Sequence, residues 1–287
     1  MKSVLVTRLE ESIQQIGKFD FGDIIANYLL FASSIPRQVK REIKRARSFS
    51  CPKGYEKGLE LLENAVRRGD DLSPWMSKSY KENESNNIDY LLFLFNILHF
   101  HIGNSFEHNR QRKITRSDKL LFAYIHDCTF YELAIEHHPQ GSSWTDLKWL
   151  NIMDDNWPEL LRPYILPNIV DLTYSPQTSE DLWKLTEAGI STFVKIGDKV
   201  IAPMGGGVTS YRKPDNNKKK DLRRIPAQYA IESNTIKNEL SKIEDTLTKA
   251  FGKEKLKKFH FKITNSHFIM FDSEQLVICI PIPKFNN

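Results

Sequence analysis

The longest apolar run of the chain, "IDYLLFLFNILHFHI" at residues 88–102, dominates its pattern of hydrophobic and polar positions. The run is interrupted by Asn96 and two histidines, and it is shorter than the roughly 20 residues that a membrane-spanning helix needs. We therefore expect it to be buried core. If residues 97–102 form a strand, its two-residue period places His99 and His101 on one face. In a helix the two side chains would diverge by about 200°.

Two further runs predict a β-hairpin downstream of this segment. Residues 120–125, "LLFAYI", are apolar on both faces, as in the middle of a sheet. Residues 129–138, "TFYELAIEHH", alternate between apolar and polar positions, and the polar pair His126 and Asp127 separates the two runs. Strict alternation would place Tyr131, Leu133 and Ile135 on one face and Glu132, Glu136 and His138 on the other.

The rest of the chain predicts helices before this sheet and a mixture of elements after it. In "GYEKGLELLENAVRRG" the apolar residues have helical spacing and Gly69 stands at the C-cap position. "STFVKIGDKVIAP" predicts a second hairpin that turns at Gly197 and Asp198. An apolar seam from Ile236 to Phe251 predicts a helix, and "FHFKIT", "HFIMF" and "LVICIPIP" predict a three-stranded meander.

These patterns together predict an α+β protein in three regions. Residues 1–85 form a helical N-terminal region, which ends in the polar stretch "SKSYKENESNN". Residues 86–140 form the central, mainly antiparallel sheet that bears the histidines. Residues 141–287 form a C-terminal α+β region, in which a helix precedes the β-meander.

The charge and the cysteine content indicate which partners and which cellular compartment suit the protein. The net charge is only +5, but the basic residues are clustered in "RQVKREIKRAR", "RQRKITR" and "KKKDLRR", which suits a polyanionic partner. The three cysteines are far apart in sequence and odd in number, so they predict neither a disulfide framework nor a C-x-x-C zinc site. The N-terminal residues become polar before a signal-peptide core could form. We therefore expect a cytoplasmic protein that is not inserted in a membrane.

Candidate chemistry is concentrated in the central region, where six of the eight histidines lie within about forty residues. Histidine populates both protonation states near neutral pH, which suits acid–base catalysis. Phosphodiester cleavage needs two such groups and a cation for the charge that develops on the phosphorane. Arg116 could supply that cation. Neighbouring phosphates could be held by Arg110, Arg112 and Lys113.

The order of Arg116, "LLFAYI", a short turn and "TFYELAIEHH" resembles the closing strands of the RelE and ParE toxin superfamily. These are small α/β proteins, and the RelE branch cleaves messenger RNA without a metal, using basic and aromatic side chains around its sheet. The resemblance covers about forty residues. It implies that the matching site residues here are Arg116, Tyr131, His137 and His138.

Other hypotheses fit the same residues. His99 and His101, with His137 or His138 and a carboxylate from Asp118 or Asp127, would make a ligand set for zinc or another transition metal. A nucleic-acid-binding or regulatory protein would use the basic clusters, and its histidines would be structural.

The hypothesis that we prefer from the sequence is a metal-independent, RNA-directed endonuclease of toxin or phage-defence type. His99 or His101 would act as the base, His137 or His138 as the acid, and Arg116 as the phosphorane stabiliser. We expect no cofactor. The expected partners are RNA and an antitoxin or activator protein.

Overall fold

The structure is a computed structural model. It describes residues 35–76, 89–107, 113–167, 169, 172, 175–212, 222–226, 249, 260–263, 267–272 and 275–281, and the strands from residue 209 onward are described by their backbone alone. The predicted C-terminal helix, His108, Arg110 and Arg112 lie outside these residues. The chain divides into two compact units, residues 30–230 and residues 1–29 with 231–287.

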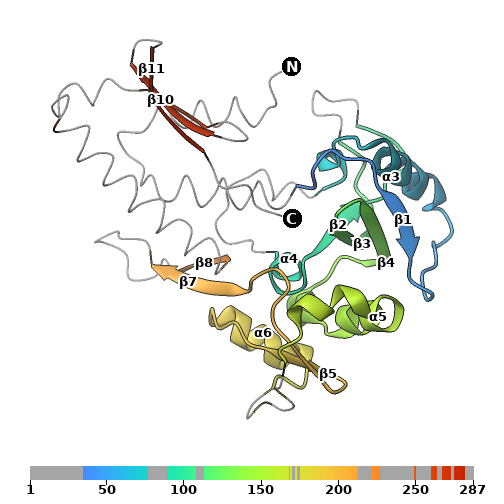
Figure 1. The fold of residues 1–287 in the computed structure, drawn as a ribbon. Helices are drawn as coiled ribbons and strands as arrows, with labels where there is room; N and C mark the ends of the chain where they lie inside the picture. The colour runs from blue at the N-terminus through green and yellow to red at the C-terminus, as the bar shows by residue number, and fades with distance from the viewer. Residues whose placement is uncertain are drawn as a thin grey trace. The chain divides into compact units, whose positions relative to one another are not determined.

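The larger unit contains a four-stranded sheet in the order β1-β4-β3-β2, together with several helices, so the protein is α+β as predicted. Strand β3 pairs antiparallel with both β2 and β4, whereas β1 pairs with β4 in parallel. Figure 1 shows this sheet between α3 and α5. The strands are β1 (Glu42–Arg45), β2 (Ile97–His101), β3 (Lys119–His126) and β4 (Thr129–His137).

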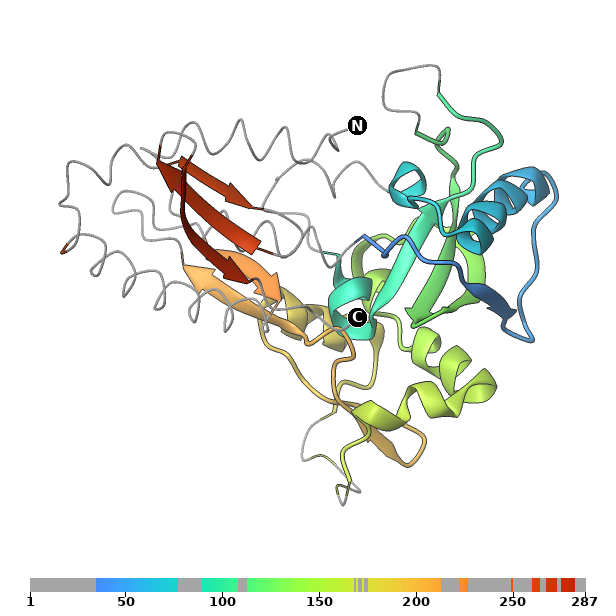
Figure 2. The same ribbon diagram turned by 45° about the horizontal axis from the view of Figure 1, so that its top comes forward.

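Each face of the sheet packs against a different helix, as both ribbon views show (Figures 1 and 2). On one face the Trp149 ring of α5 (Lys148–Asn156) lies 4.6 Å from the Phe122 ring, centroid to centroid. Helix α3 (Glu56–Arg68) lies on the other face, where it contacts β1 through its Glu63 side chain. We call these the α5 face and the α3 face.

The apolar run changes conformation in its middle. Asp89 caps the short helix α4 (Tyr90–Phe95) by accepting a hydrogen bond from the Leu92 amide at 3.2 Å. The helix ends at Asn96, whose φ of 56° is in the left-handed region that asparagine tolerates better than most residues. Strand β2 begins at the next residue and is buried along its whole length. The predictions of a buried run and of a strand bearing both histidines are confirmed.

Strand β4 departs from the predicted strict alternation. The register between β3 and β4 shifts between Phe122 and Ala123, so Leu133 forms a bulge and the faces of the strand exchange there. Glu136 lies opposite Leu120 on the α5 face, whereas Glu132 lies opposite Ala123 on the α3 face. The prediction that the two glutamates share a face was therefore wrong.

Strand β1 was not predicted, because it lies in the region expected to be helical. Its sequence, "EIKR", is charged and only four residues long, and three of the four side chains are exposed. It is held by the parallel register with β4 from Thr129 to Glu132. Because β1 joins the central sheet, the larger unit crosses the boundaries expected at residues 85 and 140.

The remaining described elements agree with the predicted hairpins. The second hairpin, β5 (Val194–Ile196) and β6 (Lys199–Ile201), turns at Gly197 and Asp198, and the φ of Gly197 is 59°. In the smaller unit, three antiparallel strands form the predicted meander in the order β11-β10-β9. The other elements are α6 (Ser179–Glu187), β7 (Val208–Arg212), β8 (Leu222–Pro226), β9 (His260–Ile263), β10 (His267–Asp272), β11 (Gln275–Pro281), and the 3₁₀ turns η2 (Ser73–Trp75), η4 (Gly141–Thr145), η5 (Pro158–Leu160) and η6 (Arg162–Tyr164).

Candidate functional site: a histidine cluster on the α5 face

Three of the predicted histidines come together at one end of the α5 face. His99 and His101 lie opposite Phe122 and Leu120, which alternate along β3, so both imidazoles project from one face. His138 follows the last residue of β4, and its ring centroid is 5.9 Å from that of His99. The prediction that the histidine pair shares a face and lies near His137 or His138 is confirmed for His138.

A tryptophan from the loop after β4 completes the cluster. The Trp144 ring makes edge contacts with two imidazoles: its centroid lies 5.5 Å from that of His99 at an interplanar angle of 65°, and 5.1 Å from that of His138 at 81°. Trp144 lies in the 3₁₀ turn η4 and is half-buried, whereas His138 is exposed. We call His99, His101, His138 and Trp144 the histidine cluster.

A buried carboxylate orients His99. The Nδ1 atom of His99 lies 3.2 Å from Oδ2 of Asp89, and both side chains are at most 9 % exposed. The nearby carboxylate favours the tautomer with hydrogen on Nδ1, in which Nε2 is the acceptor. Asp89 therefore has two contacts, since its other oxygen caps α4.

His101 has a different environment on the same strand. Burial, together with the nearby charges of His99 and Arg116, lowers the pKa of His101 to about 4. The Ser117 amide donates to Nδ1 of His101 at 3.5 Å, which assigns the hydrogen of the neutral ring to Nε2. His101 is thus a neutral hydrogen-bond donor at physiological pH and a weak base.

His138 is the member of the cluster that solvent reaches. Its Nδ1 atom lies 3.0 Å from the Pro139 carbonyl oxygen, which can only accept, so Nδ1 carries a hydrogen. Its Nε2 atom can then gain or lose a proton. Arg116 is also exposed and lies just before β3, near enough to His101 to influence its pKa.

Two other predicted residues lie apart from the cluster. His137 is 69 % exposed and faces Asp118, with 3.7 Å between Nδ1 and Oδ2. Tyr131 is buried against Trp157, with the two ring centroids 4.9 Å apart. It lies opposite Tyr124, four positions along β3 from the partner of His101, which corresponds to about 13 Å. The structure does not bring Tyr131 into the cluster.

Lys113 is placed differently from the expectation of a phosphate-binding cation on a surface loop. Only 5 % of the residue is exposed, and its carbonyl oxygen accepts a hydrogen bond from the Glu107 amide at 2.7 Å. The side chain belongs to the interior because the chain folds back there, with Phe106 and Ile114 forming an antiparallel bridge. Lys113 therefore does not present its ammonium group to a nucleic-acid strand at the protein surface.

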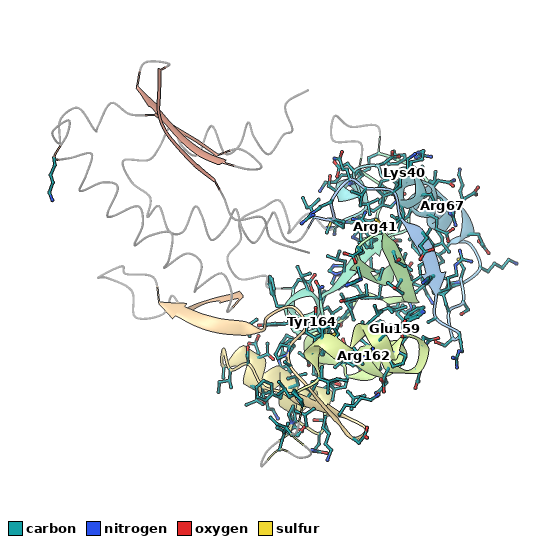
Figure 3. All side chains as sticks on the ribbon, in the orientation of Figure 1. Lys40, Arg41, Arg67, Glu159, Arg162 and Tyr164 are labelled. Carbon is teal, nitrogen blue, oxygen red and sulfur yellow. The ribbon has the colours of Figure 1, made fainter. Side chains whose placement is uncertain are left out.

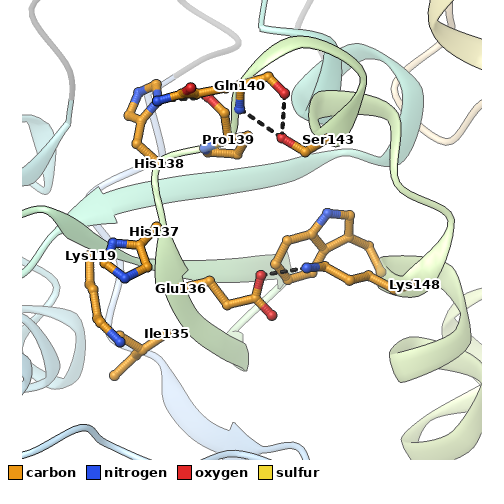
Figure 4. Close-up of a pocket in the computed structure, with 10 residues that line it drawn as sticks. Lys119, Ile135, Glu136, His137, His138, Pro139, Gln140, Ser143 and Lys148 are labelled. Atoms are coloured by element: carbon orange, nitrogen blue, oxygen red, sulfur yellow. Dashed lines mark hydrogen bonds and ion pairs between the residues drawn. The ribbon is translucent and has the colours of Figure 1, made fainter. Parts of the chain in front are cut away.

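A pocket of about 510 Å³ opens beside the cluster, at the end of the sheet where β3 begins and β4 ends (Figure 4). The apolar residues that line its walls are Ile135, Pro139 and Trp149. The polar lining residues are Lys119, Glu136, His137, His138, Gln140, Ser143 and Lys148. The pocket is therefore lined by both His137 and His138, at the end of β4.

Sequence reasoning missed Asp89 and Trp144. Asp89, near the start of the apolar run, is an N-cap signal for the residues that follow it, and it would have revealed α4 had the run been divided at Asn96. Trp144 carried no signal, because its place beside His99 depends on how the loop after β4 folds back. The described residues do not support the metal alternative. Within that part of the chain, no three His, Cys, Asp or Glu side chains are grouped closely enough to hold an ion.

Comparisons with known proteins add no relative. No family model, no curated protein and no solved structure matches this chain. No described helix is long and apolar enough to cross a membrane.

Proposed function

We propose that the protein is a metal-independent endonuclease that cleaves RNA by acid–base catalysis at the histidine cluster. One observation carries this proposal: the ring centroid of buried His99, which faces the Asp89 carboxylate, lies 5.9 Å from that of exposed His138. Two imidazoles at this separation can serve the two proton transfers of one phosphodiester. The resemblance of the hairpin to RelE-type toxins points in the same direction.

The assigned hydrogens divide the roles among the histidines. His99 acts as the base, because its Nε2 atom is the acceptor and Asp89 stabilises the imidazolium that forms. His138 acts as the acid that protonates the leaving 5′-oxygen. His101 donates a hydrogen bond from Nε2 to the phosphate, because its lowered pKa makes it a poor base. Arg116 stabilises the charge on the phosphorane.

Access to His99 sets a condition on this mechanism. Only 4 % of the residue is exposed, and the rings of His138 and Trp144 stand against it. In our proposal the 2′-hydroxyl of the substrate reaches Nε2 through the space that the half-buried Trp144 indole occupies. The indole turns aside when RNA binds and then offers its face to a base.

The setting of the activity is part of the proposal. We propose that the protein works in the cytoplasm, with RNA as substrate and an antitoxin or activator protein as regulator, in a toxin or phage-defence system. The thiols of Cys51 and Cys128 are both free, which suits a reducing compartment.

The first experiment uses the full-length chain on single-stranded RNA and on DNA of the same sequence, with and without a chelator. We expect cleavage of RNA that survives the chelator, produces 2′,3′-cyclic or 3′-phosphate ends, and follows a bell-shaped pH profile. DNA should be spared, because it lacks the 2′-hydroxyl that acts as nucleophile. Loss of cleavage with the chelator would favour the metal hydrolase. RNA binding without cleavage would favour the nucleic-acid-binding protein.

Single histidine variants assign the activity to the cluster. We expect His138→Ala to lower the rate about 10²- to 10⁴-fold while RNA affinity changes little. The matched control is His126→Ala, because His126 is also exposed but lies at the opposite end of β3 beside Asp127. His137→Ala tests the neighbouring histidine. A loss of activity in His137→Ala and not in His138→Ala would overturn the assigned acid.

A further inference from the structure

The pocket beside the cluster has a charge arrangement that the catalytic proposal does not use. One of its two lysines is held within the protein: the Lys148 ammonium forms an ion pair with Glu136 and lies 4.7 Å from the centroid of the Trp149 ring (Figure 4). Asp146 adds a second carboxylate at 3.7 Å. The charge of Lys148 is therefore compensated before any ligand arrives.

The second lysine is not compensated in this way. Lys119 is the first residue of β3 and lines the pocket beside His137 (Figure 4). Among the described residues, no carboxylate forms an ion pair with its ammonium group. The pocket therefore offers one uncompensated cation and two imidazoles, which together favour an anionic ligand.

The size and the walls of the pocket restrict that ligand further. A volume of about 510 Å³ is within the range of small-ligand sites and far exceeds the space that a bare phosphate fills. The apolar contribution of Ile135, Pro139 and Trp149 would leave such a space poorly filled by an inorganic anion. A phosphate joined to a flat, partly apolar group matches both the charge and the walls.

We propose that this pocket binds one nucleotide of the RNA strand, next to the bond that is cleaved, with its phosphate between Lys119, His137 and His138. This inference rests on the proposed function, since His138 belongs to both sites. It assigns His137 to binding of the neighbouring phosphate, a role that its exposed position permits without contact with His99.

The experiment is calorimetric titration of the full-length protein with adenosine 3′-monophosphate, adenosine and inorganic phosphate. We expect the monophosphate to bind more tightly than either of its parts. Lys119→Gln should weaken its binding about tenfold, the effect of losing one charge-assisted hydrogen bond. The control is Lys57→Gln, because Lys57 is an exposed lysine of α3. Equal affinity for the monophosphate and for phosphate would overturn the nucleotide assignment.

A second variant keeps the proposal falsifiable if Lys119→Gln does not fold. Glu136→Gln removes one of the two carboxylates that compensate Lys148, so the pocket becomes more positive and should bind the monophosphate several times more tightly. A damaged fold would weaken binding instead. Unchanged affinity in Glu136→Gln would overturn the inference.

Cleavage measured on the same proteins separates this inference from the proposed function. RNA cleavage with no binding of the monophosphate would overturn the pocket assignment and leave the endonuclease standing. Binding of the monophosphate by a protein that cleaves no RNA would overturn the endonuclease and leave the pocket as a nucleotide site.

Discussion

The two faces of the central sheet each carry a cluster of ionisable side chains, and the clusters are enclosed differently. On the α5 face the histidine cluster borders a pocket, and one of its imidazoles is exposed. On the α3 face the Glu132 carboxylate is wholly buried and faces a half-exposed Arg45. The same four strands therefore support one cluster with an imidazole that a solute can reach and one with a carboxylate that it cannot.

Ion pairs join the buried cluster to the neighbouring elements. Arg45 of β1 donates from Nε to Glu132 of β4 at 2.7 Å and forms a second ion pair with Glu63 of α3. Arg67, labelled in Figure 3, contacts the other oxygen of Glu63 at 2.7 Å. This arginine–glutamate cluster joins β1, β4 and α3, so its charges serve to hold these elements together.

The difference between the faces predicts different consequences for substitutions. Changes in the histidine cluster should reduce activity and leave the free energy of unfolding almost unchanged. Changes in the arginine–glutamate cluster should do the reverse, because a buried charge that loses its partner destabilises the fold.

The largest effect is expected from Asp89→Asn. Asparagine caps a helix about as well as aspartate, so α4 should keep its N-cap and the protein its stability. The carboxylate that orients His99 would be lost, and we expect the cleavage rate to fall about 10²- to 10⁴-fold. Cleavage assays and chemical denaturation of the same preparation measure the two effects.

Nitrogen NMR of labelled histidine gives a signature that a merely structural role of Asp89 would not affect. The His99 signals should show hydrogen on Nδ1 in the wild type and a shift toward the other tautomer in Asp89→Asn. Asp89→Ala serves as the matched comparison, because it also removes the cap and should cost about 1 kcal/mol of stability. Full activity in Asp89→Asn would remove His99 as the base.

The sequence predicted those parts of the fold and of the histidine cluster that depend on residues close together in the chain. The alternation of His99 and His101, with a β-rich hairpin close by in sequence, was sufficient to place both imidazoles on one face near His137 or His138, and the structure selects His138. The pairing of Asp89 with His99 was not visible, because the apolar run continues through the change from helix to strand at Asn96. Hydrophobic periodicity has no signal for a left-handed residue inside such a run.

Interactions between segments that are far apart in sequence could not be predicted either, because hydrophobic periodicity reports only local structure. The partners Arg45 and Glu132 are 87 residues apart, and strand β1 is too short and too charged to be recognised without its parallel neighbour. The bulge at Leu133 moved Glu132 to the opposite face from Glu136, which strict alternation cannot anticipate. The sequence therefore predicted the open cluster better than the closed one.

Arg45→Ala should produce the largest loss of stability. It leaves the Glu132 carboxylate buried without its cation, and we expect the free energy of unfolding to fall by about 3 kcal/mol at pH 8. Denaturant titration measures this, with Arg68→Ala as control, because Arg68 is exposed and its ion pair is with exposed Asp70. RNA cleavage below the unfolding midpoint should be retained. A loss under 0.5 kcal/mol, on the order of a surface substitution, would show that the cluster contributes little to the fold.

Glu132→Gln should change the pH dependence of stability. Burial is the main cause that raises the pKa of Glu132 from 4.5 to about 7; Arg45 opposes this shift, and the charge of Glu63 adds to it. Between these two pH values the folded protein retains a proton that the unfolded chain has lost. The free energy of unfolding therefore falls as the pH rises through this window, by at most about 1.4 kcal/mol per pH unit.

Glutamine cannot ionise, so the variant should show a flatter profile between pH 4.5 and pH 7. Denaturant titrations at a series of pH values compare the two proteins. Because His101 ionises near pH 4, it contributes at the acidic end of this range and should affect both proteins alike. Parallel profiles for the two proteins would assign the pH dependence to other groups.

The smallest effect is expected for Arg116→Gln when the salt dependence of RNA affinity, rather than the cleavage rate, is measured. If Arg116 contacts one phosphate of a single strand, its loss should reduce the slope of log K against log salt concentration by about 0.7. The control is Arg47→Gln, because Arg47 is an exposed arginine just after β1, a strand that the histidine cluster does not touch. Fluorescence anisotropy with labelled RNA at several salt concentrations gives both slopes. Equal slopes for the two variants would place Arg116 outside the RNA path, because a cation that approaches the phosphorane must also release a counterion when the strand binds.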